Sequence, residues 1–340
     1  MSTKALFNAG IIVILALFGG MQAYLNPPVT IGLVCAGWVT VGLSFVCWQK
    51  SPVWAVVWPL PVAALVSALA NTDIAPSSGA RLWLYGVALS LLFVTGRLVT
   101  SDQLLFGLLL AAGPWLLASV WMEDNPNIKA VWAVVFILAF AGAHHEGWLF
   151  NREAFIFSVP FGVYLLALGS RGAFVGLTIG LFAFYAPRTT HHASRITLFS
   201  LGGLALLGLL ILWRPETAGY RLHYWQQALG AFLANPLFGV GPGGLWARQI
   251  ITEPGGGFQL HAHNFIISSV AEMGLVGLAG LLYASGKIYA SRLTLHASPW
   301  QLAIVTALLG HSLVDEPLFW PGPLLFLALV LGTIQERGDR

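Results

Sequence analysis

A long run without charge near the start of the chain constrains its fold more than any other feature. No Asp, Glu, Lys or Arg occurs from Ala5 to Gln49. A helix needs about 20 apolar residues to cross a bilayer, so this run is long enough for two spans. The first apolar segment (5–25) is too long for a signal-peptide core, and we expect it to be retained. The chain is therefore predicted to be a polytopic membrane protein.

The composition of the whole chain supports this class. Only 9% of the 340 residues are charged, against about a quarter in soluble domains, and the mean hydropathy is +0.79. These values exclude a soluble globular enzyme, a disordered chain and a small disulfide scaffold. The pI near 9.0 fits a membrane protein that collects Lys and Arg on its cytoplasmic side, and no basic run with aromatics indicates nucleic acid.

Polar and Pro/Gly-rich breaks predict the span boundaries. We expect an all-α, polytopic membrane fold with about twelve transmembrane helices and one long loop on the outer face. Ten of the sixteen Lys and Arg side chains then lie on the side of the N-terminus, which favours cytoplasmic termini. The predicted spans are 5–25, 29–48, 53–70, 82–100, 103–122, 129–144, 153–169, 171–187, 196–213, 263–284, 299–314 and 318–334.

The long loop, residues 214–262, is predicted to contain regular structure. Apolar residues at helical spacing over 217–234 predict a helix at the membrane surface that ends at Asn235-Pro236. The glycine-rich run 239–244 formally matches G-x-G-x-x-G, but no predicted strand precedes it. We therefore expect a turn-rich loop rather than a dinucleotide site.

Ionisable residues gather at the predicted outer ends of the spans, where burial is costly unless the groups function or are paired. A convergence of cations and histidines at one membrane face would suit an anionic, lipid-linked substrate. Each arginine also has a plainer interpretation, as a snorkelling or solvent-exposed side chain. The residues come from four parts of the chain: Arg171, Arg221, His261, His263, His311, Asp315 and Glu316.

His263 stands at the start of an apolar helix that carries Gly274 and Gly277 on the same predicted face. A neutral histidine at a water-accessible helix end is a natural general base, and glycines at this spacing let a neighbouring helix approach closely. A capping or interface histidine, with Asn264 as the helix cap, explains the spacing equally well. Glu272, on the far side of the helix, is expected to pair internally.

A metal site is the weaker interpretation of the same residues. His261-x-His263 could form half of such a site, with His311 or Asp315 as further ligands. No cysteine, H-E-x-x-H motif or second closely spaced ligand pair supports it. We therefore expect no metal and no other cofactor.

Four motifs in order resemble the O-antigen ligase and O-antigen polymerase superfamily. The resemblance covers about residues 160–335 and is closest to the ligases. We accordingly divide the chain into N-terminal transmembrane helices (1–160) and a ligase-like transmembrane region (161–340) that includes the loop. The motifs are Ser170-Arg-Gly-Ala-Phe, Arg221-Leu-His-Tyr-Trp-Gln-Gln-Ala with Asn235-Pro-Leu-Phe-Gly-Val-Gly-Pro-Gly, His263-Asn264 with Gly274-x-x-Gly277, and His311-Ser-Leu-Val-Asp-Glu-Pro-Leu.

The resemblance implies a glycosyltransferase with a GT-C-like helical fold in the bacterial inner membrane. It would move a glycan from an undecaprenyl-pyrophosphate carrier to an acceptor hydroxyl on the periplasmic face, without metal. His263 would activate the acceptor hydroxyl, and Arg171 and Arg221 would hold the pyrophosphate. A single displacement of this kind predicts inversion at the anomeric carbon. Candidate accessory residues are His261, His311, Asp315 and Arg248, with Arg214 as another possible cation.

The acceptor distinguishes the alternative functions. We expect lipid A–core, as for an O-antigen ligase in lipopolysaccharide synthesis. A Wzy-type polymerase, with a second lipid-linked repeat as acceptor, and a protein O-oligosaccharyltransferase would share the chemistry. A transporter or flippase is the alternative from a different class. It fits less well because transporters place ionisable groups near the bilayer midplane, whereas these gather at the outer face.

Overall fold

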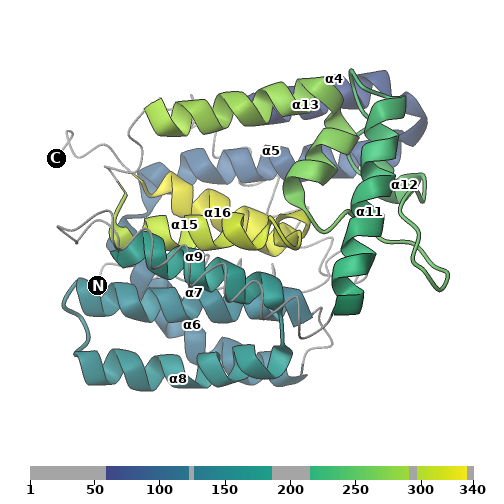
Figure 1. Ribbon diagram of the computed structural model, residues 1–340. Helices are drawn as coiled ribbons and strands as arrows, with labels where there is room; N and C mark the ends of the chain where they lie inside the picture. The colour runs from purple at the N-terminus through teal and green to yellow at the C-terminus, as the bar shows by residue number, and fades with distance from the viewer. Residues whose placement is uncertain (1–58, 122–125, 186–214, 291–296, 335–340) are drawn as a thin grey trace.

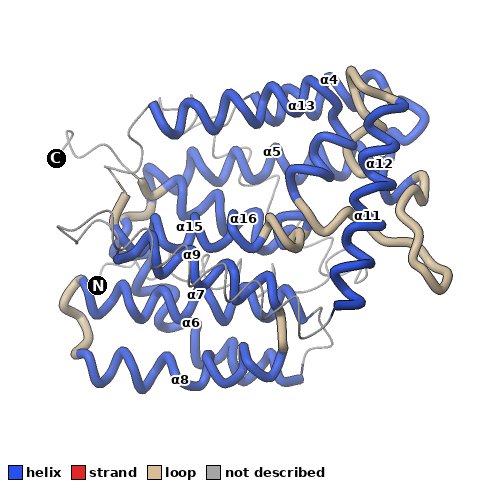
Figure 2. The backbone as a smooth tube through the Cα atoms, viewed as in Figure 1, coloured by secondary structure: helices blue, strands red, loops and turns tan. Residues whose placement is uncertain are grey.

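The computed structural model describes residues 59–121, 126–185, 215–290 and 297–334, and within these ranges the regular structure is entirely helical (Figures 1 and 2). The all-α prediction is therefore confirmed for the described part of the chain. The predicted spans 5–25, 29–48 and 196–213 lie outside the described residues.

The helices follow the apolar segments that the sequence indicates, and residues 217–234 are helical as expected. In Figure 1, α13, α5, α16, α9, α7 and α8 lie one below another, while α11 stands across the ends of this stack. The elements are α4 (Pro59–Ala70), η1 (Thr72–Ile74), α5 (Ala75–Leu98), α6 (Ser101–Trp121), α7 (Pro126–His145), α8 (Asn151–Leu168), α9 (Arg171–Tyr185), α11 (Pro215–Ala234), α12 (Gly244–Ala247), α13 (Phe265–Ala290), α15 (Pro299–His311), η3 (Pro317–Phe319) and α16 (Pro321–Gly332).

Two of the described helices are long and apolar enough to cross a bilayer. They are α7 and the Phe265–Ala284 part of α13, and α4, α9 and parts of α6 and α16 are shorter apolar helices. About twelve spans and a GT-C-like arrangement therefore stay predictions.

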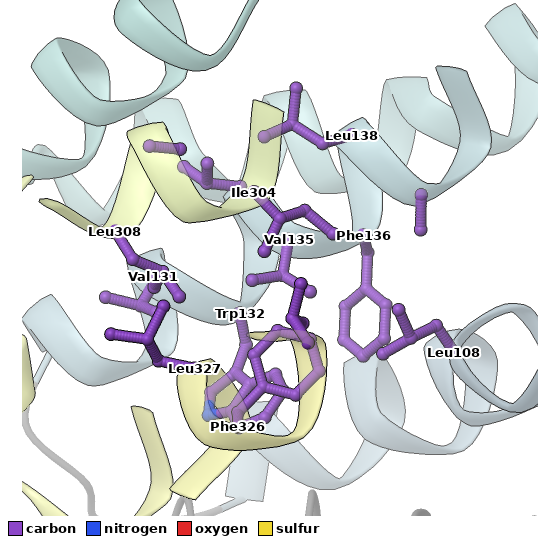
Figure 3. Close-up of a cluster of buried hydrophobic side chains, with 14 of the residues drawn as sticks. Leu108, Val131, Trp132, Val135, Phe136, Leu138, Ile304, Leu308, Phe326 and Leu327 are labelled. Atoms are coloured by element: carbon purple, nitrogen blue, oxygen red, sulfur yellow. The ribbon is translucent and has the colours of Figure 1, made fainter. Parts of the chain in front are cut away.

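Helix α7 is the centre of the core, and most of its side chains are buried. Trp132 lies 5.0 Å from Phe326 of α16 between ring centroids (Figure 3). Phe136 lies 5.3 Å from Trp115 of α6, also between ring centroids. Aromatic pairs at these separations attract one another beyond their simple burial. The core thus joins helices from both predicted parts of the chain.

A stripe of glycines on α9 lets its backbone approach α15 closely. A Cβ atom on Gly176 would lie 2.6 Å from the carbonyl oxygen of Ala307, and one on Gly180 would lie 2.8 Å from that of Ala303. Small residues at such spacing permit close helix contact. At the end of the stripe, the same contact brings Gly172 against the His311 ring.

Helix α13 is interrupted at Gly274, and the glycine-rich loop supplies hydrogen-bond partners for backbone groups at the interruption. Gly274 has φ 62° and ψ −153°, which interrupts the helical hydrogen bonds. The N–H groups of Val240 and Gly241 donate to the carbonyls of Ala271 and Glu272 at 3.0 and 2.9 Å, and Leu275 N–H donates to Pro236 O at 2.8 Å. The run 239–244 therefore satisfies backbone groups that the break exposes.

This break changes the interpretation of the predicted Gly274–Gly277 face. The prediction placed His263 on one continuous helix with both glycines, but α13 begins at Phe265 and is interrupted at Gly274. A Cβ on Gly274 would meet the loop carbonyl of Leu237 at 2.4 Å, and one on Gly277 would meet Met273 of the same helix at 2.5 Å. The close helix contact lies on α9 instead.

We expect Gly274→Ala to lower the unfolding temperature, because only glycine readily adopts this backbone conformation and an added Cβ would collide with the loop. The backbone strain alone costs about 1–3 kcal/mol. The matched control is Gly230→Ala on the exposed face of α11, where no described atom lies within 4 Å of an added Cβ. Equal unfolding temperatures for the two variants in detergent would contradict this account.

Candidate functional site

Three segments meet at His263: helix α11, the loop before α13, and the turn between α15 and η3. The start of α9 packs next to them, against His311 and Asp315. His263 has φ 55°, an uncommon backbone conformation for a residue other than glycine. Its Nδ1 lies 2.8 Å from Asp315 Oδ1, and its Nε2 lies 3.3 Å from Gln259 Oε1. Backbone strain of this kind persists where the surroundings hold it, and it is common at functional sites.

Two rings hold the imidazole of His263 in place. Tyr224 of α11 stacks on it with centroids 5.7 Å apart, and the His261 ring lies 4.6 Å away on edge. The backbone N–H of His263 donates to His261 Nδ1 at 3.2 Å. This bond makes Nδ1 the acceptor nitrogen of His261. Burial and the charge of His263 hold the pKa of His261 well below its usual value, so His261 is neutral.

Asp315 is the carboxylate that orients His263. Its Oδ1 also accepts the backbone N–H of Glu316 at 2.8 Å. Burial by itself would raise the pKa of Asp315, but the hydrogen bond from His263 and the three nearby histidines outweigh burial and lower the pKa below its usual range. A carboxylate only accepts, so His263 carries its proton on Nδ1. Its Nε2 is the nitrogen that can take up a proton from a substrate.

His311 lies on the other side of Asp315. Its Nε2 is 4.0 Å from Asp315 Oδ2, and within the described ranges neither buried atom has a hydrogen-bond partner. A Cβ on Gly172 would lie 2.5 Å from His311 Nε2, so the first turn of α9 packs directly on this ring. The backbone of Arg171, the first residue of α9, therefore lies next to this ring.

The predicted cations have different contacts in the structure. Arg221, one turn before Tyr224 on α11, interacts electrostatically with His311. Arg248 instead bonds Asp73 at 2.9 Å and Asn71 at 3.0 Å, next to η1. Arg221 thus lies near the histidines, while Arg248 joins α12 to the α4–α5 turn. Arg214 lies outside the described residues.

Asn264 has the capping role that the sequence allowed. Its Oδ1 accepts the N–H of Ile267 at 3.0 Å, and its Nδ2 donates to Leu313 O at 2.8 Å. The residue caps α13 and ties its start to the turn after α15. Asn264 thereby helps to hold His263 beside Asp315.

A buried charge cluster behind His261 was missed by the sequence analysis. Arg81 Nη1 donates to Phe319 O at 2.6 Å, and its guanidinium lies 3.5 Å from the centre of the Phe319 ring. That ring in turn lies 4.8 Å from His261. Glu316 accepts a hydrogen bond from Ser268 Oγ and lies 3.5 Å from His261 Nδ1. The sequence analysis did not single out Arg81, because its burial depends on the packing of α5 against the C-terminal helices.

Glu272 pairs internally, as expected. It is buried, it is close enough to Arg81 for their charges to interact, and it accepts backbone hydrogen bonds from Gly243 and Leu245. Tyr224 and Gln259 were also missed as contacts of His263. No sequence motif marks Gln259, because the fold of the loop alone brings it there.

The site could also hold a metal ion. His261, His263 and Asp315 each offer one ligand atom, and these atoms lie within 4.8 Å of one another. Two imidazoles and a carboxylate suit zinc and similar ions. In the conformation described here, however, His263 and Asp315 are already joined by a hydrogen bond.

The helices and the site define a helical membrane protein with a bonded histidine–carboxylate pair, His263 and Asp315, near Arg221. Residues 155–282 match the family model described as O-antigen ligase, which confirms the resemblance to the O-antigen ligase and polymerase superfamily. Over this segment the chain resembles O-antigen ligase-like or polymerase-like membrane enzymes of the glycosyltransferase type. This family implies lipid-linked glycan donors and glycan acceptors in general. No curated protein matches the chain.

The matched segment contains Arg171, Arg221 and His263 and ends before His311 and Asp315. The family match therefore does not reach the carboxylate that bonds His263. The importance of Asp315 rests on the geometry of this chain.

We expect Glu316→Gln to remove part of the pH dependence of stability. Burial raises the pKa of Glu316 well above its usual value of 4.5, and Ser268 and Arg81 offset this only in part. The folded chain then keeps a proton that the unfolded chain releases, so the free energy of unfolding falls as pH rises from 4.5 toward the raised pKa. Glutamine stays neutral at every pH, so the free energy of unfolding of the Glu316→Gln variant does not show this fall.

The measurement is the unfolding temperature in detergent between about pH 5 and 8, the range in which such linkage is commonly followed. Glu146→Gln, an exposed site in the turn after α7, is the matched control and should follow the wild-type slope. A Glu316→Gln slope parallel to that of the wild type would show that Glu316 is not held protonated.

Proposed function

We propose that the chain transfers a glycan from an undecaprenyl-pyrophosphate carrier to a hydroxyl group of lipid A–core at the periplasmic face of the inner membrane. The observation that carries this proposal is the 2.8 Å bond between His263 Nδ1 and Asp315 Oδ1. It fixes the proton on Nδ1, so that Nε2 is the nitrogen that can act as a base. The family match supports a glycan transferase, and the neighbouring arginines support an anionic donor.

His263 Nε2 takes the proton of the acceptor hydroxyl as the acceptor oxygen attacks the anomeric carbon. Asp315 acts as a positioning residue, because it holds the imidazole and stabilises the positive charge that develops on it. The stacked Tyr224 ring limits rotation of the imidazole. A positioned general base of this kind contributes about 10²–10⁴-fold to the rate.

The leaving group is the pyrophosphate of the carrier lipid. As the new glycosidic bond forms, the bond between the anomeric carbon and the phosphate oxygen breaks, and its electron pair stays on the pyrophosphate. Arg171 and Arg221 would bind this charge through guanidinium hydrogen bonds. Attack opposite the leaving group inverts the anomeric centre. Because two arginines neutralise the leaving group, the step requires no metal.

We expect His263→Asn to lower kcat by about 10²–10⁴-fold, because the general base is lost. The assay contains EDTA and undecaprenyl-pyrophosphate glycan, with lipid A–core in one reaction and no added acceptor in another. The matched control is His145→Asn at the exposed end of α7, which should leave the rate unchanged. Full activity of His263→Asn, or retention of the anomeric configuration, would refute the mechanism.

The same assay separates the acceptors. Metal-independent transfer to lipid A–core supports the ligase function. Longer lipid-linked chains in the reaction without added acceptor would indicate a Wzy-type polymerase. If neither reaction proceeds, an exported protein substrate is tested next as the acceptor.

A further inference from the structure

Arg81 is a buried cation in the second turn of α5, 238 residues before Phe319 in the chain. The carboxyl groups of Glu272 and Glu316 are close enough for electrostatic interaction with its guanidinium. A buried ion pair often stabilises a fold no more than apolar side chains of the same volume do. Ionisable residues inside membrane proteins commonly serve function instead. The contacts of the guanidinium indicate which function Arg81 serves.

The guanidinium of Arg81 holds Phe319 in two ways. Its Nη1 donates to the Phe319 carbonyl oxygen at 2.6 Å, and its central carbon lies 3.5 Å from the centre of the Phe319 ring. A guanidinium can make both contacts because it is a flat cation with several N–H donors, whereas the ammonium group of lysine lacks this shape. The backbone and the ring of Phe319 are therefore both held by Arg81.

The ring of Phe319 supports His261, which in turn fixes the backbone of His263. The Phe319 and His261 rings pack with their centroids 4.8 Å apart, and His261 Nδ1 accepts the backbone N–H of His263 at 3.2 Å. His263 has φ 55°, a conformation that persists where the surroundings hold it. One route of contacts thus leads from Arg81 through the Phe319 ring to the backbone of the proposed base.

The backbone of Phe319 supports Asp315, which orients the imidazole of His263. Phe319 N–H donates to the Glu316 carbonyl at 3.0 Å, and Glu316 N–H donates to Asp315 Oδ1 at 2.8 Å. The same Oδ1 lies 2.8 Å from His263 Nδ1. A hydrogen bond to the Phe319 carbonyl therefore limits movement of the turn that carries Asp315. This second route reaches the imidazole of the proposed base.

The stem of Arg81 is itself held in place by the glycine-rich run. A Cβ built on Gly243 would lie 3.4 Å from Arg81 Cγ, so this part of the loop packs on the stem. About one turn earlier on α5, Ser78 Oγ donates to the carbonyl of Pro242 at 3.1 Å. The guanidinium is therefore fixed from behind before it meets Phe319.

We propose that Arg81 is a positioning residue for the transfer reaction, because it keeps Phe319 in the place from which the partners of His263 are held. This inference rests on the proposed function of His263 as the base. Because Arg81 is buried, it acts through His263 and not on the substrates. It also gives the N-terminal helices a part in the chemistry, since Arg81 lies outside residues 155–282 that match the family model.

We expect Arg81→Ala to lower kcat by about 10–10²-fold, because a small displacement of a catalytic group has an effect of this size, while the KM for donor and for lipid A–core stays within about twofold. Guanidinium ion, added far below the concentration that unfolds proteins, should restore much of the lost kcat by filling the vacated space. Urea has nearly the same shape but no charge and should not restore it.

The matched control is Arg152→Ala at the exposed start of α8, which should leave kcat unchanged with or without guanidinium. A wild-type kcat in Arg81→Ala would overturn the proposal. Equal effects of guanidinium and urea, or no restoration by either, would also overturn it, because the guanidinium group itself would then not be what the site requires.

Two further variants keep the test independent of whether Arg81→Ala folds. Arg81→Lys keeps the positive charge and removes the flat group of donors, and Phe319→Leu removes the ring and keeps the carbonyl. Each should lower kcat, and the loss in the double variant should be smaller than the product of the two single losses, because both act through one contact. Losses that multiply fully would refute action through Phe319.

The same substitution in a His263→Asn background separates this proposal from the proposed function. If Arg81 acts through His263, Arg81→Lys should lower the residual transfer rate of His263→Asn no further. A further loss equal to that in the wild-type background would refute the positioning role, while the proposed function would stand. Full transfer by His263→Asn alone would instead refute the proposed function.

Discussion

The close approach of α9 to α15 is the contact on which the rest of the site depends. Glycines on α9 allow the two backbones to meet at distances that any larger side chain would prevent. Because the stripe ends at Gly172, the contact also sets the first turn of α9 against His311. The backbone next to Arg171, far from His311 in the sequence, thereby lies close to the turn that carries Asp315. A packing requirement thus determines where the first turn of α9 lies.

A second constraint comes from the broken helix α13. A helix interrupted at Gly274 exposes carbonyl and N–H groups that must find partners, and the loop after α11 supplies them. Since the loop follows α11 in the chain, these hydrogen bonds also hold α11 across the end of the helix stack (Figure 1). Tyr224 and Arg221 are placed by this docking. The glycine-rich run therefore acts through its backbone.

The sequence predicted the class of fold and much of the site. Apolar segments between polar breaks located the helices, and the helical spacing before Asn235 located α11. The outer-end histidines and Asp315 do converge. The prediction of one face from His263 to Gly277 failed because spacing alone cannot reveal a helix break. Arg248 is a cation of the kind expected at the site. In the structure its partner is Asp73, which only the packing of η1 brings near.

By itself, the sequence determined that this chain is helical and apolar, and which few charged residues could do chemistry. Those properties follow from composition and local periodicity, which depend on residues near one another in the chain. The tertiary structure alone decided that His263 is bonded to Asp315, that Arg81 lies buried behind His261, and that Gln259 lies next to the other ring nitrogen of His263. These contacts join residues from separate helices and loops, and their geometry depends on how glycines and broken backbone segments let those elements pack.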